Sequence, residues 1–405
     1  MASPKLRFKE FDGQWKTVQL KNCIASMDSG WSPQCESYPA DLNQWGVLKT
    51  TSVDWSGFKE NANKRLPDNL EPRLEIEVKP EDILVTRAGP TERVGVVSVV
   101  PKNVRSHLLI SDKLIRLKSN NQNDPNFLGI SLASSKCQNQ LQSKTSGLAK
   151  SQTNISQKIL LDVSLQTPNK AEQTKIASFL SAVDEKISQL TQKHELLSQY
   201  KQGMMQKLFS QQIRFKADDG SEFGEWGDKK LGDISKTFSG GTPSSAKKEY
   251  YEGNIPFIKS GEISEKYTEQ FINELALNNS SAKLVKKGDL LYALYGATSG
   301  QVAISQIDGA INQAVLCIRS NLNTIYLLNF FLLQKDSILS TYLQGGQGNL
   351  SASILKEIQL PVPCLEEQTK IANFLSAIDQ KINVVSEQLE QAKLWKKGLL
   401  QQMFV

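Results

Sequence analysis

The chain has 405 residues, of which 39% are apolar and 22% charged, so it resembles an ordinary folded protein with room for two or three domains. Its net charge of +6 is compatible with binding nucleic acid but does not require it. There is no run of 18 apolar residues and no apolar core of a secretion signal near the N-terminus, so we expect no membrane contact and a cytoplasmic location.

The residue types that most enzymes need are scarce. Only two histidines are present, and the five cysteines are scattered without a Cys-x-x-Cys pair, which argues against a metal site and for reduced thiols. No Walker loop, nucleophile elbow or dinucleotide fingerprint occurs. A faint nuclease-like triplet, Pro67-Asp68 with Glu77-Val-Lys79, has no counterpart later in the chain. We therefore expect no metal, no catalytic residues and a chain that recognises rather than catalyses.

Residues 1–168 predict a mixed α/β domain with a β-rich core. Asp82–Thr86 and Val94–Val100 are short runs rich in β-branched residues that predict buried strands, and Phe127–Ser134 predicts a helix. Residues 1–150 hold 21 basic and 16 acidic side chains, a net charge of +5.

Residues 169–209 predict one long helix. Asn169 is the expected N-cap and Glu172 its capping-box partner. Apolar residues then alternate at spacings of four and three, which predicts a helix of about 55 Å with a coiled-coil seam. The seam positions are Ile176, Val183, Leu190, Leu197 and Met204, and Leu180, Ile187, His194, Lys201 and Leu208.

Residues 210–363 predict a polar linker, ending near Phe223, and a second α/β domain. Arg214-Phe-Lys216 repeats Arg7-Phe-Lys9, Leu290–Tyr292 predicts a buried strand, and Thr324–Leu333 predicts a helix. Residues 214–350 carry a net charge of −1, from 14 basic and 15 acidic side chains.

Residues 364–405 repeat the first helix. Glu367–Ile382 matches Glu172–Ile187 at 13 of 16 positions, at an offset of 195 residues, and the match extends without a gap to Phe209 and Phe404. The domains before the helices align more loosely: Gly13-Gln-Trp15 with Gly224-Glu-Trp226, Ser32-Pro33 with Thr242-Pro243, and Asp82–Thr91 with Asp289–Thr298. The chain is therefore two copies of one unit.

Two matching seams in one chain are most simply buried against each other. We expect an α+β protein whose two mixed domains are joined by an intramolecular antiparallel coiled coil with pseudo-two-fold symmetry. A coiled coil between two chains is the alternative. Lys201 and Lys396 occupy equivalent seam positions, where they either extend to solvent near the helix ends or set the helix register.

Loops of both domains combine cations, hydroxyls and amides near glycines, which suits contacts to phosphates and base edges. For any single residue, a solvated turn is an equally good explanation. The candidate DNA-binding residues are Lys49, Thr50, Thr51, Arg87, Thr91, Arg93 and Lys150 in the first domain, and Thr242, Ser244, Lys259, Ser260, Tyr295, Thr298, Gln347 and Asn349 in the second.

The doubled helix, with Glu-Gln-Thr-Lys-Ile-Ala-x-Phe-Leu-Ser-Ala-x-Asp-x-Lys-Ile followed by Lys-x-Gly-x-x-Gln-x-x-Phe, closely resembles the specificity subunit of type I restriction-modification systems. Phe11-Asp-Gly-Gln-Trp15 and Gly240-Gly-Thr-Pro-Ser244 are similar to that family's domain openings. The resemblance covers the whole chain. It implies two target-recognition domains that each read half of a bipartite, asymmetric double-stranded DNA site, and a helical spacer that sets the gap.

The resemblance further implies that the helices dock two methyltransferase (M) subunits and that restriction (R) subunits complete a host-defence complex. DNA methylation from S-adenosylmethionine and ATP- and Mg-dependent steps then belong to those partners, with no cofactor in this chain. The implied docking residues are Glu172, Lys175, Phe179 and Asp184, and Glu367, Lys370, Phe374 and Asp379. The alternatives are a stand-alone bipartite DNA-binding scaffold or regulator, and a coiled-coil protein with two protein-binding heads.

Overall fold

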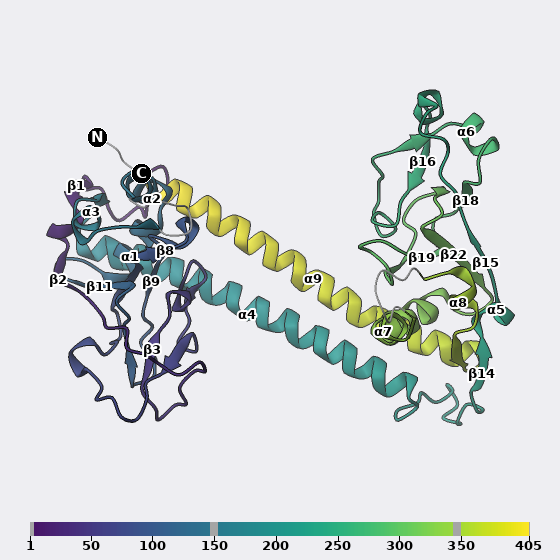
Figure 1. The fold of residues 1–405 in the computed structure, drawn as a ribbon, viewed down its shortest axis with the longest axis horizontal. Coiled ribbons are helices and arrows are strands. Elements are labelled where there is room, and N and C mark those ends of the chain that lie inside the picture. Colours follow the sequence, from purple (N-terminus) through teal and green to yellow (C-terminus); the bar gives the residue numbers. More distant parts are fainter. Residues whose placement is uncertain (1–3, 146–152, 343–349, 405) are drawn as a thin grey trace. The chain divides into compact units, whose positions relative to one another are not determined.

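The computed structural model describes residues 4–145, 153–342 and 350–404, and the chain divides into two compact units. Unit 1 comprises Met1–Gln189 and Leu389–Val405, and unit 2 comprises Leu190–Gln388. The long helices α4 (Lys170–Phe209) and α9 (Leu365–Met403) each contribute one section to each unit (Figure 1). Each unit therefore holds one globular domain and its own section of the helix pair.

The domain of unit 1 is built on an antiparallel sheet with strand order β2-β11-β7-β9. A smaller sheet, β10-β3-β6, contains a parallel pair, and β1 pairs with β13 directly before α4. The elements are β1 (Lys16–Gln19), β2 (Ile24–Ser29), β3 (Gly46–Leu48), β4 (Val53–Asp54), β5 (Gly57–Phe58), β6 (Asn63–Arg65), β7 (Ile83–Thr86), β8 (Ala88–Gly89), β9 (Val97–Val99), β10 (Leu108–Leu109), β11 (Leu114–Ser119), α1 (Pro125–Ala133), α2 (Ser135–Gln142), β12 (Thr153–Asn154), α3 (Gln157–Leu161) and β13 (Ser164–Thr167).

The domain of unit 2 repeats this plan. Its main sheet has the order β15-β22-β19-β20, a second sheet has the order β17-β16-β21-β18 with β16 and β21 parallel, and β14 pairs with β23 before α9. The elements are β14 (Gly227–Lys230), α5 (Leu231–Ile234), β15 (Ser235–Ser239), β16 (Ile255–Ile258), β17 (Phe271–Ile272), α6 (Glu274–Asn278), β18 (Lys283–Val285), β19 (Leu290–Ala293), β20 (Val302–Ile304), β21 (Gly309–Ile311), β22 (Val315–Ser320), α7 (Thr324–Tyr342), α8 (Ala352–Lys356) and β23 (Gln359–Val362). The loosely aligned domains thus share one topology.

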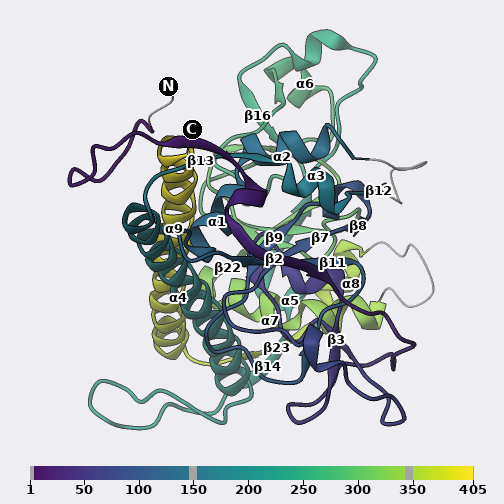
Figure 2. The same cartoon turned by 90° about the vertical axis from the view of Figure 1, so that its left-hand side faces the viewer.

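Within each unit the two long helices pack together in opposite directions. In unit 1 Ile176 and Leu180, near the start of α4, share a buried cluster with Leu399 and Met403, at the end of α9. Figure 2 shows α4 and α9 side by side. In unit 2 the end of α4 meets the start of α9 in the same way. The predicted antiparallel intramolecular coiled coil is confirmed, and the seam buries apolar side chains in both helices.

The two seam lysines form equivalent ion pairs across the helices. Lys201 Nζ lies 2.7 Å from an Asp379 carboxylate oxygen in unit 2, and Lys396 pairs with Asp184 in unit 1. The four residues are related by the 195-residue offset of the repeat. The Lys201 side chain is only 14% exposed, so its positive charge is stabilised mainly by the Asp379 carboxylate and less by solvent. The pairs favour the second explanation of these lysines, that they set the register.

We expect Lys201→Glu to lower the free energy of unfolding by about 1–2 kcal/mol, because it places two carboxylates together in the seam. Adding Asp379→Lys should restore most of the loss, since the reversed pair attracts again. Urea denaturation of the single and double variants measures both effects. Lys193→Glu, at an exposed position of the same helix, is the control. A double variant no more stable than Lys201→Glu would contradict the pairing.

Each long helix ends in the domain of the other repeat. Phe209, at the end of α4, packs on α7 of unit 2, with ring centroids 5.1 Å from Tyr326 and 5.9 Å from Phe330. Phe404, just after α9, stacks on Phe127 of α1 in unit 1 at 5.6 Å. The last residue of the repeated Lys-x-Gly-x-x-Gln-x-x-Phe motif is therefore an anchor that fastens each helix to the opposite domain.

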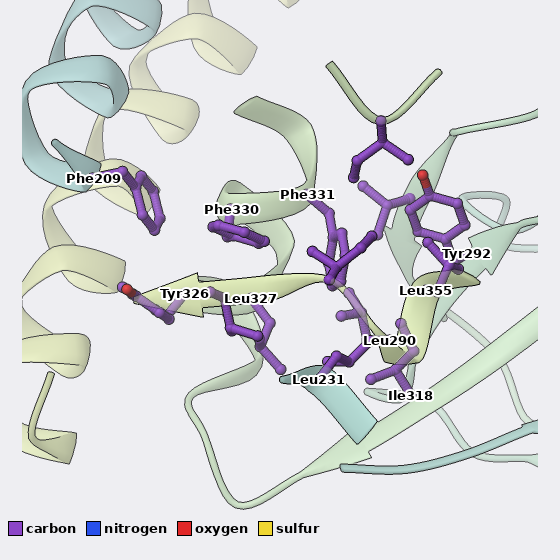
Figure 3. Packing of buried hydrophobic residues seen from close by; sticks show 14 of the residues in the cluster. Phe209, Leu231, Leu290, Tyr292, Ile318, Tyr326, Leu327, Phe330, Phe331 and Leu355 are labelled. Carbon is purple, nitrogen blue, oxygen red and sulfur yellow. The ribbon is translucent and has the colours of Figure 1, made fainter. Parts of the chain in front are cut away.

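The core of unit 2 connects the helix end to the main sheet (Figure 3). Tyr326, Phe330 and Phe331 of α7 extend from Phe209 to Tyr292 on β19, and the Tyr292 and Phe331 rings are 5.4 Å apart. Burial raises the pKa of Tyr292 to about 12, so its hydroxyl stays neutral. Burial of this many aromatic side chains is the main force that fixes α7 between the helix pair and the sheet.

Two predicted elements differ in extent from the structure. Val94–Val100 contains only the short strand β9, because Gly95 has a positive φ of 83° and turns the chain. The helix predicted at Thr324–Leu333 continues to Tyr342 as α7. Among the described residues, no helix is both long and apolar enough to cross a membrane.

Candidate functional site

A buried carboxylate fastens the start of each domain to the start of its long helix. Glu172 is fully buried and accepts hydrogen bonds from Arg7 Nε and Nη2, both at 2.7 Å, and from Trp15 Nε1 at 3.2 Å. Asn169 caps α4 as predicted, because its side chain accepts from the Glu172 N–H at 3.0 Å. The prediction that Glu172 completes a capping box is wrong, because its carboxylate binds the Arg7 guanidinium and the Trp15 indole N–H. A charged guanidinium forms a stronger hydrogen bond with a carboxylate than a backbone N–H does.

Unit 2 contains the same arrangement of glutamate, arginine and tryptophan, which we call the clamp. Glu367 is fully buried and accepts from Arg214 Nε and Nη2 at 3.1 and 2.7 Å and from Trp226 Nε1 at 2.8 Å. Hydrogen bonding to the carboxylate raises the pKa of both arginines above its usual value. Glu172 and Glu367, predicted as docking residues, are therefore buried and hold the N-terminal segment of each domain on its helix.

The remaining helix residues implied as docking sites lie nearer the surface. Lys175 is exposed, lies over the Phe8 ring at 5.5 Å and is 3.5 Å from Glu10. Its counterpart Lys370 donates to the Lys216 carbonyl and pairs with Asp218. Asp184 and Asp379 are engaged in the lysine pairs described above. These contacts fix the side chains on the helix face next to the seam.

Each unit carries an aromatic patch on this face. In unit 1 the patch consists of Phe8, Phe179 and Trp395, with the Phe179 ring 5.6 Å from Phe8 and 5.9 Å from Trp395. In unit 2 the equivalent positions are Phe215, Phe374 and Tyr200, with the two phenylalanine rings 5.7 Å apart. Trp395 and Tyr200 are 54% and 52% exposed, which is typical of binding surfaces rather than of a satisfied core.

In the first domain, the predicted recognition residues form a supported turn. The Arg93 guanidinium donates to the carbonyls of Thr50 and Val53, at 3.0 and 2.6 Å, and to Asp54 at 3.1 Å. This brings Lys49, Thr50, Thr51 and Arg93 together, with Lys49 and Thr51 exposed. Arg93 thus positions the turn through its Nη1 and Nη2 donors, whereas Lys49 and Thr51 are exposed.

Arg87 and Thr91 flank the short β8–β12 pair. Arg87 is exposed, and Thr91 Oγ1 lies 2.7 Å from Thr153 Oγ1. Arg87 is therefore available to a phosphate, while Thr91 also links two segments of the domain.

We expect Arg93→Ala to lower the free energy of unfolding by about 2 kcal/mol, because three buried or half-buried oxygens lose their donor. Arg87→Ala should change it by less than about 0.5 kcal/mol, because that side chain is exposed. Thermal and urea denaturation of both variants measure the difference. Equal stabilities would contradict the role assigned to Arg93.

In the second domain, Gln313, a residue that the sequence analysis missed, contacts one predicted residue and acts on another. Thr242 Oγ1 donates to Gln313 Oε1. Burial raises the pKa of Tyr295 above its ordinary value, and the nearby Gln313 side chain lowers it. Thr298 follows Tyr295 by three residues and is half-buried. Its carbonyl accepts from the Gln301 N–H at 3.0 Å.

The other candidates of this domain lie in separate turns. Ser244 is exposed and accepts from the Lys247 N–H through its carbonyl, and Lys259 and Ser260 are half-buried in a turn held by Glu262. Lys150, Gln347 and Asn349 lie outside the described residues. No group of three or more His, Cys, Asp or Glu side chains in the described parts of the chain is placed to hold a metal ion.

The duplicated fold, with equivalent helix faces and dissimilar polar loops, defines a class of protein: two domains of similar topology on one antiparallel helix pair. A family model described as the type I restriction modification DNA specificity domain matches residues 50–199 and 224–394. The chain belongs to this family and is a DNA specificity subunit of a type I restriction-modification system, which is the non-catalytic subunit.

Relatives and solved structures agree with this assignment. The chain is 42% identical to the EcoEI specificity subunit of Escherichia coli over 166 residues, which is 40% of this chain and 28% of that subunit. It is 29% identical to the putative MjaX specificity subunit of Methanocaldococcus jannaschii over 98% of this chain and 94% of that one. The fold is similar to the S subunit from M. genitalium, with a TM-score of 0.67 at 16% identity over 100% and 99% of the two chains.

Proposed function

We propose that each globular domain of this specificity subunit reads one half of a bipartite, asymmetric double-stranded DNA target. Residues 1–168 and the domain within residues 210–363 would be the two readers, and the helices at 169–209 and 364–405 the spacer that sets the gap. One observation carries the proposal: the domains share a topology, yet their loops differ in chemistry. The first presents exposed Lys49 and Arg87, whereas the second presents Thr242, Gln313 and Tyr295.

The difference in charge supports two unlike half-sites. Residues 1–150 carry +5 and residues 214–350 carry −1. Phosphate contacts by Lys and Arg dominate affinity, while hydrogen bonds to base edges give specificity. The first domain would therefore supply more of the salt-dependent attraction, and the second would depend on hydrogen bonds and on its partners.

The helical part would dock two methyltransferase subunits, one on each aromatic patch. The helix residues of the two patches are related by the 195-residue offset, and Phe8 and Phe215 stand at matching places in the repeated Arg-Phe-Lys segments, so two identical partners could bind the patches in equivalent ways. Adenine methylation from S-adenosylmethionine would take place on those subunits, and restriction subunits, with ATP and Mg, would complete the complex. The complex would act in the cytoplasm, where it meets DNA.

Co-expression of the chain with the methyltransferase subunit encoded beside it tests the proposal. N6-methyladenine would be mapped by single-molecule sequencing in a host without adenine methylation. Methylation of one split, asymmetric motif, dependent on this chain, is the expected result. An assembled, active complex that methylates a continuous or palindromic motif would overturn the half-site proposal. Sequence-specific DNA binding by the isolated chain, with no complex formed, would favour a stand-alone regulator.

A further inference from the structure

The two domains place one pair of polar residues at the same point of their folds. The point follows the first strand of each main sheet, where Gly30 comes after β2 and Gly240 after β15. A Cβ atom on Gly30 would lie 1.8 Å from the Ile110 carbonyl oxygen, and one on Gly240 would lie 1.7 Å from that of Ile311. Only glycine permits so close a crossing of the two segments, so both domains bring the same chain positions together.

In each domain, the hydroxyl residue two positions after the glycine hydrogen-bonds the side chain two positions after the isoleucine. In the first domain Ser32 donates to Asp112 Oδ1 and accepts from the Asp112 N–H at 3.2 Å. In the second, Thr242 donates to Gln313 Oε1. Ser32 and Thr242 each lie two residues after the glycine, and Asp112 and Gln313 each lie two residues after the isoleucine. All four are exposed.

The Gln313 amide is held at its oxygen and is not saturated. The oxygen accepts from Thr242, and the half-buried Tyr295 is close enough for Gln313 to lower the pKa of its hydroxyl. An amide offers two acceptor lone pairs and two N–H donors, so a second acceptor position and a donor remain for a ligand. A fixed, exposed amide with one acceptor and one donor matches adenine, which presents N6–H₂ and N7 in the major groove.

Asp112 presents different chemistry at the same position. As a carboxylate it only accepts hydrogen bonds, and in the described part of the chain its Oδ2 atom makes none. An acceptor without a donor matches the N4 amino group of cytosine. The neighbouring residue Lys113 and the adjacent Arg87 are exposed cations, whereas the corresponding Ala314 and Leu294 are buried. The first domain thus places two exposed cations, which could bind phosphates, beside its acceptor, and the second domain has none at the corresponding positions.

We propose that Asp112 and Gln313 are equivalent base-reading residues, Asp112 for cytosine in one half-site and Gln313 for adenine in the other, each held by its hydroxyl partner. This inference rests on the proposed half-site function. It adds which side chains determine the sequence read by each domain, and why the two halves of the target differ.

Gln313→Glu tests the second domain, because it keeps the shape and the acceptor of the side chain but removes the donor. In the complex with methyltransferase subunits, the variant should lose the preference for adenine at one position of one half-site. Methylation at sites with adenine there should fall about ten- to hundredfold. The other half-site serves as an internal control and should stay unchanged.

Asp112→Asn tests the first domain, because the amide gains a donor where the carboxylate had none. The variant should accept adenine in place of cytosine at one position of the opposite half-site, with the half-site affected by Gln313→Glu unchanged. Asp68→Asn and Gln306→Glu, at positions outside the pair in the same two domains, are matched controls that should leave the motif intact. Thermal melting and the assembled mass verify that each variant complex is folded.

An unchanged motif in a folded Gln313→Glu or Asp112→Asn complex would overturn the inference, as would a change in the wrong half-site. If a variant abolishes methylation altogether, binding of its complex to duplexes carrying each base at every half-site position decides the matter. Loss confined to one position supports base reading, and equal loss for all bases overturns it. Failure of the half-site proposal itself would be distinct, because the unaltered chain would then give no split motif.

Discussion

Glu367→Ala is expected to lower the free energy of unfolding by about 3 kcal/mol, whereas Glu366→Ala, one residue away, should change it by less than about 0.5 kcal/mol. Glu367 is fully buried and accepts three hydrogen bonds from Arg214 and Trp226. Its removal leaves the Arg214 Nε and the Trp226 indole N–H without an acceptor, while Arg214 Nη2 keeps the Phe223 and Gly224 carbonyls. Glu366 is exposed on the same first turn of α9, so any general effect of negative charge near the helix start is shared.

Urea denaturation of the two variants provides the measurement. Glu367→Gln separates charge from hydrogen bonding, because the amide keeps one acceptor, and it should be intermediate in stability. If Glu366→Ala and Glu367→Ala were equally stable, the clamp would not hold the domain on its helix, and the repeated Arg, Trp and Glu residues would need another explanation.

If the aromatic patches dock two methyltransferase subunits as proposed, Trp395→Ala should weaken binding at one patch by about thirtyfold or more, and Tyr200→Ala should do the same at the other. Both side chains are about half exposed, at 54% and 52%, and belong to the aromatic patches of unit 1 and unit 2. Partly exposed tryptophan and tyrosine are among the side chains that contribute most to protein interfaces. Because the patches are equivalent, each single variant should retain one intact site.

Native mass spectrometry of the complexes gives the stoichiometry directly. At a methyltransferase concentration that saturates the unaltered chain, single variants should carry one partner and the double variant none. Tyr267→Ala, which removes an aromatic side chain 73% exposed elsewhere in unit 2, is the control and should carry two. Two partners bound to the double variant with unchanged affinity would show that the aromatic patches are not the docking surface.

The periodic and repeated features could be predicted from the sequence because they are local. The seam spacing predicts the two helices, and the 195-residue repeat makes them equivalent. The contacts of Ile176 and Leu180 with Leu399 and Met403 confirm the expected antiparallel direction, whereas the aspartate partners of the seam lysines were not predicted. These predictions depend on periodicity that survives any change in the loops.

The contacts that the sequence analysis missed depend on residues far apart in the chain. Glu172 binds Arg7, 165 residues earlier, so the local capping-box pattern gave the helix start but not the use of the carboxylate. The repeat carried a signal of this contact, because all three residues recur together: Arg7 as Arg214, Trp15 as Trp226 and Glu172 as Glu367. Asp112 and Gln313 gave no such signal, because only the glycine crossings place them beside Ser32 and Thr242.

Exchange of one domain tests the central claim most directly. Residues 214–350 would be replaced by the matching segment of a relative with a different target, and N6-methyladenine would be mapped in the assembled complex. A change confined to one half-site, with the other half-site and the gap retained, is the predicted result. A change in both half-sites, or in neither, would contradict the claim that the two domains read DNA independently from a shared helical scaffold.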